Sequence, residues 1–347
     1  MCKKALFYRF KKKFIVKKLV NQTKKGYNIL NDDINMERSM FMAKTICVYN
    51  QKGGVGKSTC ACNLSYALGI MGRKVLLIDF DAQGSATIML NINKWDETIP
   101  NIGFPMSNFA INGNRPQIDD LLDCIQTPSW QKKEKVPNSM LWREVDVPYP
   151  FDVIPVCGIE LSVAENAIFN RKNYIYKHVE YGFVMLKFIV QKLSDELNYD
   201  YIIIDANPSL SASAINALMA SDFLVTPTDM AYESIVGISA ILQRLKELNL
   251  FLPYFTPLGV ICQKYKGNRN LDKTVRDIIE ENEFDVFNTT IPDVASQVSN
   301  SIAKGKLISV DNEKVRKAYT DLATEIEAKI IKLESEHGEI KNRIRED

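Results

Sequence analysis

A short segment rich in glycine and lysine lies early in the chain, between two runs of apolar residues. The segment Gln51–Thr59 reads QKGGVGKST, with the apolar run Thr45–Asn50 before it and a helical apolar pattern after it, up to Gly72. Glycines let backbone N–H groups turn inward around an anion, and a helix that begins there directs its positive end toward the same point. Lys57 and Ser58 suit phosphate oxygens and Mg²⁺. The spacing therefore favours a phosphate-binding loop between a strand and a helix over a chance glycine-rich turn.

Two further segments end an apolar strand pattern with aspartate. Lys74–Asp79 is apolar up to its last residue, with Asp81 two positions later, and Tyr201–Asp205 has the same form. Ligands bind at the carboxyl ends of parallel strands, where a carboxylate can hold Mg²⁺ or orient a water molecule for attack on a phosphate. The sequence therefore predicts an enzyme that binds a nucleoside triphosphate with Mg²⁺ and hydrolyses it.

Strand and helix patterns alternate along most of the chain after residue 44. This alternation predicts an α/β fold with a doubly wound, mostly parallel sheet. Residues 91–150 are harder to read, with turn-like segments and one short helical piece near Ile118–Ile125. The other expected strands are Phe151–Val156, Phe223–Thr226, Leu258–Cys262 and Val286–Ile291, and the other expected helices are Phe183–Leu197, Ala212–Ala220, Ile235–Leu248, Leu271–Glu281 and a long charged helix from about Asn312 to the end.

These motifs resemble those of a known family. Lys52–Ser58 is similar to the K-G-G-x-G-K-[ST] hallmark of the ParA/MinD family of deviant Walker A P-loop NTPases, which are SIMIBI-like. Asp79–Gly84 (DFDAQG) is similar to the family's D-x-D-P-Q-G segment, with Ala82 in place of proline. Tyr201–Asp205 is similar to its Walker B strand, although Asn207 replaces a proline that usually follows. The similarity extends over about residues 43–330.

The resemblance implies a role for each matched residue. Lys57 would bind the phosphates, and Lys52 would reach across a sandwich dimer to the partner's nucleotide. Asp81 would position the attacking water, so Lys52, Lys57 and Asp81 form the expected catalytic set. The expected ATP-binding residues are Gly53, Gly54, Val55, Gly56, Lys57, Ser58 and Thr59, and the expected Mg²⁺ site is formed by Ser58, Asp79 and Asp205.

The resemblance also implies a cellular role. ParA-type partition proteins form ATP-dependent homodimers, bind DNA non-specifically and hydrolyse ATP when a ParB-like centromere-binding partner stimulates them. The D-x-D-x-Q-G form favours this branch, in plasmid or chromosome segregation. Binding of the DNA backbone needs lysine and arginine. Arg269 matches a DNA contact of the family and Lys266 lies close to it, although Asp293 stands where a further basic residue is usual.

Other branches of the family fit less well. MinD relatives bind membrane through a C-terminal amphipathic helix, but Glu334–Asp347 is too polar to embed one face in lipid. Relatives of the nitrogenase iron protein hold a cluster between paired cysteines, but the seven cysteines here are scattered, as is typical of reduced thiols in a cytosolic protein. Two alternatives stay open, an ATPase that positions a protein cargo and one that acts at a membrane surface.

The N-terminal segment differs in charge from the rest. Residues 1–41 hold eleven lysines and arginines and three acids, whereas the remainder holds 33 basic and 39 acidic residues. The segment is a basic amphipathic helix for a membrane or nucleic acid, a solvated extension, or the product of a misplaced start before Met36, Met40 or Met42. We expect a cytoplasmic, nucleoid-associated chain. Its expected parts are the extension at 1–41, an ATPase domain at 42–335 and a charged tail at 336–347.

Overall fold

A computed structural model describes most of the chain from Ala43 onward. The described residues are 43–96, 98–137, 139–170, 185–209, 211–229, 255–267, 269–281 and 284–346. The basic extension at residues 1–41 and the helix expected at Ile235–Leu248 lie outside them.

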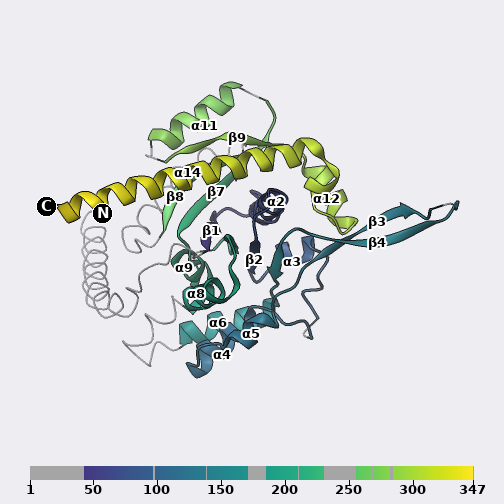
Figure 1. Cartoon of the computed structure of the whole chain (residues 1–347), viewed down its shortest axis with the longest axis horizontal. Coiled ribbons are helices and arrows are strands. Elements are labelled where there is room, and N and C mark those ends of the chain that lie inside the picture. Colours follow the sequence, from purple (N-terminus) through teal and green to yellow (C-terminus); the bar gives the residue numbers. More distant parts are fainter. Residues whose placement is uncertain are drawn as a thin grey trace, which may run out of the picture. The chain divides into compact units, whose positions relative to one another are not determined.

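Within the described residues, seven strands form one parallel sheet in the order β5-β2-β6-β1-β7-β8-β9 (Figure 1). The strands are β1 (Lys44–Val48), β2 (Val75–Phe80), β5 (Asp152–Ile154), β6 (Tyr201–Ala206), β7 (Phe223–Asp229), β8 (Thr256–Tyr265) and β9 (Val286–Pro292). β1 lies between β6 and β7, at the middle of the sheet. The predicted α/β fold with a parallel, doubly wound sheet is confirmed.

The central strands are apolar throughout because each of their faces is covered. Along β1, Ile46 and Val48 belong to the core on one side of the sheet, whereas Cys47 between them belongs to the core on the other side. Successive side chains of a strand point to opposite faces, so a strand buried on both faces reads as a continuous apolar run. This is why the runs at β1, β2 and β6 could be assigned from the sequence.

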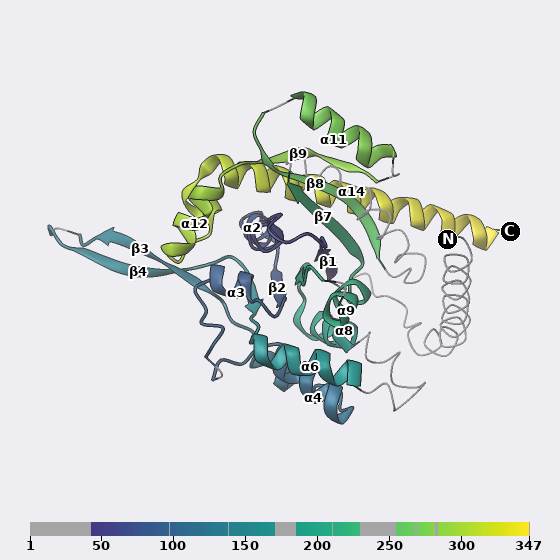
Figure 2. The same cartoon turned by 180° about the vertical axis from the view of Figure 1, so that it is seen from behind.

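Helices cover both faces of the sheet (Figure 2). One side holds α2 (Lys57–Ile70), α3 (Ser85–Met89), α12 (Ala295–Ala303), α13 (Ile308–Asp311) and α14 (Glu313–Glu346). The other side holds α4 (Gly103–Asn112), α5 (Ile118–Leu122), α6 (Gly158–Asn170), α8 (Met185–Leu197), α9 (Ala212–Ala220) and α11 (Arg269–Glu281). The helices expected at Phe183–Leu197, Ala212–Ala220 and Leu271–Glu281 match α8, α9 and α11 to within two residues where they are described.

An antiparallel hairpin within residues 91–150 was not predicted. β3 (Ser129–Lys135) pairs with β4 (Trp142–Pro148), and the two strands extend away from the central sheet (Figures 1 and 2). None of their side chains is buried, and β3 has only polar residues after Trp130, so the alternation of apolar and polar residues that marks a strand is weak. At the base of the hairpin, Trp130 packs against Tyr149 with ring centroids 4.6 Å apart and ring planes tilted by 49°.

The C-terminal helix is one long element. α14 packs against α2 and β9 through Val315, Tyr319, Leu322 and Ile326, which are all buried. The same helix continues through the segment that was expected as a charged tail, up to Glu346. Among the described helices, none combines the length and the apolar character that a membrane crossing needs.

Candidate functional site

The three predicted motifs meet at one edge of the sheet. In the strand register, Asp205 at the end of β6 is paired with Val48 of β1 on one side and with Asp79 of β2 on the other. The glycine-rich loop follows β1 directly, so it begins beside both carboxylates. On the other side of β1, the end of β7 brings Asp229 to the same edge, paired with Gln263 of β8.

The glycine-rich loop owes its shape to backbone angles that glycine adopts readily. Gly54 and Gly56 have φ of 75° and 92°, in the left-handed region. Gly56 is also the residue before α2, and a Cβ added to it would lie 2.5 Å from Oε1 of Gln263. Glycine has no side chain that could cap the first turn of α2. The N–H groups of that turn therefore stay available for an anion bound in the loop.

Lys57 lies inside this site. The side chain donates a hydrogen bond from Nζ to the carbonyl oxygen of Lys52 at 3.1 Å, and the residue is buried. Burial lowers the pKa of the Lys57 ammonium, while the charges of Asp205 and Asp81 act in the opposite direction. The cation thus stands close to both carboxylates, at the start of α2, where phosphate oxygens would meet it.

Lys52 has a different environment. Its Nζ lies 3.3 Å from each carboxylate oxygen of Asp229 on β7. Its backbone N–H donates to Oδ1 of Asn50 at 2.8 Å, and the amide of Asn50 donates to the carbonyl oxygen of Pro227 at 2.7 Å. The contacts with Asp229 and with Pro227 attach the start of the loop to β7.

Asp205 has the buried, unpaired carboxylate of the site. Both of its oxygens are shielded from solvent and accept no hydrogen bond from the described residues. Burial raises the pKa of the Asp205 carboxyl well above its ordinary value, and the charge of Asp79 adds to the rise, whereas the nearby hydroxyl of Ser58, which lies outside ordinary hydrogen-bond geometry, opposes it. Leaving such a group without a partner is costly. A divalent cation beside Ser58 and Asp205 would remove that cost, so these residues fit a Mg²⁺ site.

Asp79 is already held by its own neighbours. Its Oδ2 accepts hydrogen bonds from the backbone N–H and from Oγ1 of Thr87, each at 2.7 Å, and Oδ1 accepts from the N–H of Asp81 at 3.3 Å. Thr87 Oγ1 in turn accepts from the N–H of Val156 at 3.1 Å. Burial raises the pKa of Asp79, and the hydrogen bonds from Thr87 oppose the rise. Asp79 therefore connects β2, α3 and the end of β5, and its direct ligation of a metal ion stays a prediction.

Asp81 begins the loop after β2. Its Oδ1 accepts from the N–H of Gln83 at 2.9 Å, and its carbonyl oxygen accepts from the N–H of Gly84 at 2.7 Å. The ammonium of Lys94 donates to the carbonyl oxygen of Gln83 and lies 4.7 Å from the ring centre of Trp95. The turn that carries Asp81 thus forms with alanine at position 82, in place of the proline of the family motif.

The two residues expected to bind DNA lie outside this edge. Lys266 follows β8, is largely exposed and lies 3.5 Å from Oδ2 of Asp293. Arg269 is the first residue of α11, and its side chain lies outside the part of the structure that can be described. Asp293, which stands where the family usually has a basic residue, is therefore the ion-pair partner of Lys266. This pairing reduces the local positive charge.

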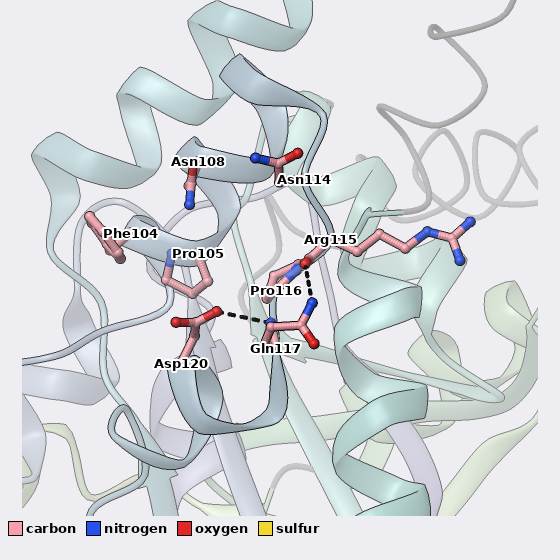
Figure 3. A pocket seen from close by; sticks show the side chains of 8 residues that line it. All are labelled: Phe104, Pro105, Asn108, Asn114, Arg115, Pro116, Gln117 and Asp120. Atoms are coloured by element: carbon pink, nitrogen blue, oxygen red, sulfur yellow. Dashed lines mark hydrogen bonds between the residues drawn. The ribbon is translucent and has the colours of Figure 1, made fainter.

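A separate hollow lies between α4 and α5 (Figure 3). Phe104, Pro105, Asn108 and Gln117 line it, and Asp120 accepts a hydrogen bond from the N–H of Gln117 at 2.9 Å. Its lining shares no residue with the phosphate loop or the two aspartate motifs. The side chain of Arg115 points away from the other lining residues and lies 4.0 Å from the ring centre of Phe188.

Several residues at the sheet edge were missed by the sequence analysis. They are Thr87, Lys94, Asp229, Gln263 and Lys264. A signal existed for two of them, because Gln263 and Lys264 are polar residues that follow the apolar run of β8 directly. None of the five belongs to a motif, and their contacts join segments distant in sequence.

Comparison with known proteins agrees with this geometry. A family model described as an AAA domain matches residues 43–252. The sporulation initiation inhibitor protein Soj of Bacillus subtilis is 29% identical over 291 residues, which cover 83% of this chain and 99% of Soj. The chromosome partitioning protein ParA of Caulobacter vibrioides is 26% identical, over 82% of this chain and 93% of its own length. The chain belongs to the ParA/MinD family of P-loop ATPases.

Solved structures of this ParA/MinD-type fold hold nucleotides. A plasmid partition protein of Borrelia burgdorferi bound to AMPPNP is 27% identical, with a TM-score of 0.55 over 83% of this chain and 99% of that one. Cobyrinic acid a,c-diamide synthase of Mycobacterium smegmatis, with an ATP analogue and Mg²⁺, has a TM-score of 0.58 at 22% identity, over 81% and 93% of the two chains, and shows the shared fold alone. The ligands of these structures agree with the prediction that the cofactors are ATP and Mg²⁺.

The residues of the site can be related to that chemistry. Mg²⁺ bound with a nucleotide neutralises charge on the phosphate oxygens during phosphoryl transfer. We expect Ser58 and Asp205 to hold the ion and Lys57 to hold the phosphates. The carboxylate of Asp81 lies at the same edge, where it can orient a water molecule. The assignment of these individual roles stays a prediction.

Proposed function

We propose that the chain is an ATP-dependent DNA partition protein that segregates a plasmid or a chromosome. It binds Mg-ATP, forms a sandwich homodimer, binds DNA non-specifically and hydrolyses ATP at its terminal phosphoric anhydride bond when a ParB-like partner stimulates it. The observation that carries the proposal is the match to Soj over 99% of that protein's length, together with Lys52 in the phosphate loop. A cytoplasmic, nucleoid-associated location follows from the proposal.

The structure supports hydrolysis through three groups at one edge of the sheet. Lys57 supplies a buried cation, Asp205 a carboxylate without a hydrogen-bond partner among the described residues, and Asp81 a further carboxylate at the end of β2. Catalysis of phosphoryl transfer consists mainly of such positioning and charge stabilisation. Lys52 reaches the same edge and is half-exposed, so it is accessible to a second subunit.

The proposal is tested by DNA binding of the full chain with ATP, with ADP and without nucleotide. Binding should require ATP, should be independent of DNA sequence and should weaken steeply with salt, because phosphate contacts release counterions. The variant Arg269→Ala should weaken binding for all sequences alike, whereas Lys317→Ala on α14, where Lys317 pairs with Asp321 one turn later, is the matched control.

Two outcomes separate the alternatives. DNA binding that is equal with and without ATP would originate from the basic segment at residues 1–41 and would contradict partition by a nucleotide-gated dimer. ATP hydrolysis without any DNA binding would instead favour the ATPase that positions a protein cargo. Binding of anionic vesicles by the ATP-bound form would favour action at a membrane surface.

A further inference from the structure

One lysine beside the phosphate loop has an unusual backbone conformation. Lys264, the ninth residue of β8, has φ of 54°. The other non-glycine residues with positive φ in the described part of the chain are Asn91 and Asn198. Asparagine enters the left-handed region readily, whereas for lysine it costs roughly 1–2 kcal/mol. Such strain persists only where surrounding contacts maintain it.

The strained backbone changes the direction of the side chain. In a regular strand the side chains of Gln263 and Lys264 would point to opposite faces of the sheet. Here both contact the same loop. Nε2 of Gln263 donates to the carbonyl oxygen of Gly56 at 3.3 Å, and Nζ of Lys264 donates to the carbonyl oxygen of Gly54 at 2.7 Å. The end of β8 therefore holds the loop at two carbonyl groups.

The contact at Gly54 acts where the loop has open space beside it. A Cβ added to Gly53 or Gly54 would meet no atom within 4 Å, so nothing packs against this part of the loop where a side chain would be. In a loop that binds phosphate through its N–H groups, the carbonyl groups point outward. The peptide group is planar, so a hydrogen bond that fixes the carbonyl of Gly54 also fixes the direction of the N–H of Val55.

We propose that Lys264 is a positioning residue for the nucleotide, which holds the phosphate-binding loop in its binding conformation through the carbonyl of Gly54. The proposal rests on nucleotide binding at this loop, which is one part of the proposed function, and it is independent of DNA binding. A preformed loop binds more tightly because less conformational freedom is lost when the ligand binds. The strain at Lys264 is then the cost of placing a charged donor at the outer side of the loop.

The test compares three variants of the full chain by equilibrium binding of a fluorescent ATP analogue with Mg²⁺. Lys264→Met removes the donor and keeps the length of the side chain, and should weaken binding about tenfold or more, as expected for a hydrogen bond from a charged group. Lys264→Arg keeps a charged donor and should remain within about threefold of the parent protein. In steady-state hydrolysis, Lys264→Met should raise KM by a similar factor and change kcat by less than about threefold.

Lys264→Gly separates positioning from a merely structural role. It removes the donor but also relieves the left-handed strain, so nucleotide affinity should fall while the unfolding temperature of the nucleotide-free protein stays equal or rises. Repeating the measurements at high salt separates loop positioning from long-range attraction of the phosphates, since only the latter is screened. The control is Lys273→Met, an exposed lysine on α11, which should bind like the parent.

Unchanged affinity in a folded Lys264→Met protein would overturn the proposal. So would a loss of affinity in Lys264→Met that disappears at high salt, or a Lys264→Gly protein that loses stability and affinity together. Absence of DNA binding in the parent protein, with normal nucleotide affinity, would contradict the partition function and leave this inference intact.

Discussion

The ammonium of Lys52 lies 3.3 Å from both carboxylate oxygens of Asp229 in the same chain. If Lys52 reaches the nucleotide of a partner subunit, as the family resemblance implies, this contact must break when the dimer forms. The pair is partly open to solvent, with side chains 38% and 11% exposed, so its contribution is modest, about 0.2–1 kcal/mol. Asp229 therefore competes weakly with the partner's nucleotide for Lys52.

The variant Asp229→Asn should dimerise more readily with ATP. Each subunit of the dimer loses one such pair, so removing the competing charge should lower the dimer dissociation constant about two- to thirtyfold, as measured by light scattering over a range of protein concentrations. Asp293→Asn removes the surface partner of Lys266 and serves as the control. An unchanged or weaker ATP-dependent dimer would show that Asp229 does not restrain Lys52.

Asp205 should make the nucleotide-free and metal-free protein less stable as the pH rises. Burial raises the pKa of its carboxyl in the folded state, so between the unfolded value of about 4 and the raised value the folded chain binds more protons than the unfolded chain. The contribution of Asp205 to stability is then fully present below about pH 4 and is lost as the pH rises through the pKa of Asp205 in the folded chain. Urea denaturation at several pH values should therefore show a smaller pH-dependent loss in Asp205→Asn than in the parent.

The same Asp205→Asn variant should be more stable than the parent at neutral pH and should lose Mg²⁺-dependent nucleotide affinity. A gain in stability together with a loss of Mg²⁺-dependent nucleotide affinity would show that Asp205 serves ligand binding and not the stability of the fold. An Asp205→Asn protein that is less stable than the parent at neutral pH would contradict the inference that the buried carboxylate destabilises the ligand-free fold.

Thr87 should be important for stability although it belongs to no motif. Thr87→Val removes the hydroxyl that donates to Asp79 and accepts from the N–H of Val156, which leaves two buried groups short of a partner. The expected loss is about 1–3 kcal/mol in the free energy of unfolding, measured by chemical denaturation. Thr87→Ser keeps the hydroxyl and should recover most of the loss, whereas equal losses in both variants would point to packing of the methyl group.

Gly56→Ala should weaken nucleotide binding, because the side chain of Gln263 must rotate away from the new Cβ and give up its hydrogen bond to the loop. The new Cβ would lie 2.5 Å from Oε1 of Gln263, and φ of 92° adds backbone strain. Gly72→Ala is a matched control, because φ there is 86° but a Cβ would meet no atom within 4 Å. Both variants should lose stability by about 1–2 kcal/mol from strain, and only Gly56→Ala should lose nucleotide affinity in a binding titration. Equal nucleotide affinity in Gly56→Ala and Gly72→Ala would show that a Cβ at position 56 does not obstruct the nucleotide site.

The sequence allowed the central sheet and three motifs to be placed because their signals are local. A strand buried on both faces reads as an apolar run, and Lys57, Asp79 and Asp205 follow or end such runs at fixed spacing. The hairpin β3–β4 escaped prediction because its strands are covered by little else and therefore lack an apolar face. The contacts of Lys52 with Asp229 and of Lys264 with Gly54 join segments 177 and 210 residues apart, which no local pattern encodes.

The contact of Lys94 with Trp95 gives the protein an internal optical probe. The ammonium that lies over the Trp95 ring also donates to the carbonyl of Gln83, in the loop that carries Asp81. Any rearrangement of that loop would move a positive charge relative to an indole that is 68% exposed, and so would change its emission. The chain has three tryptophans, so replacing Trp130 and Trp142 by phenylalanine would leave a single fluorophore that reports movement of this loop without a dye.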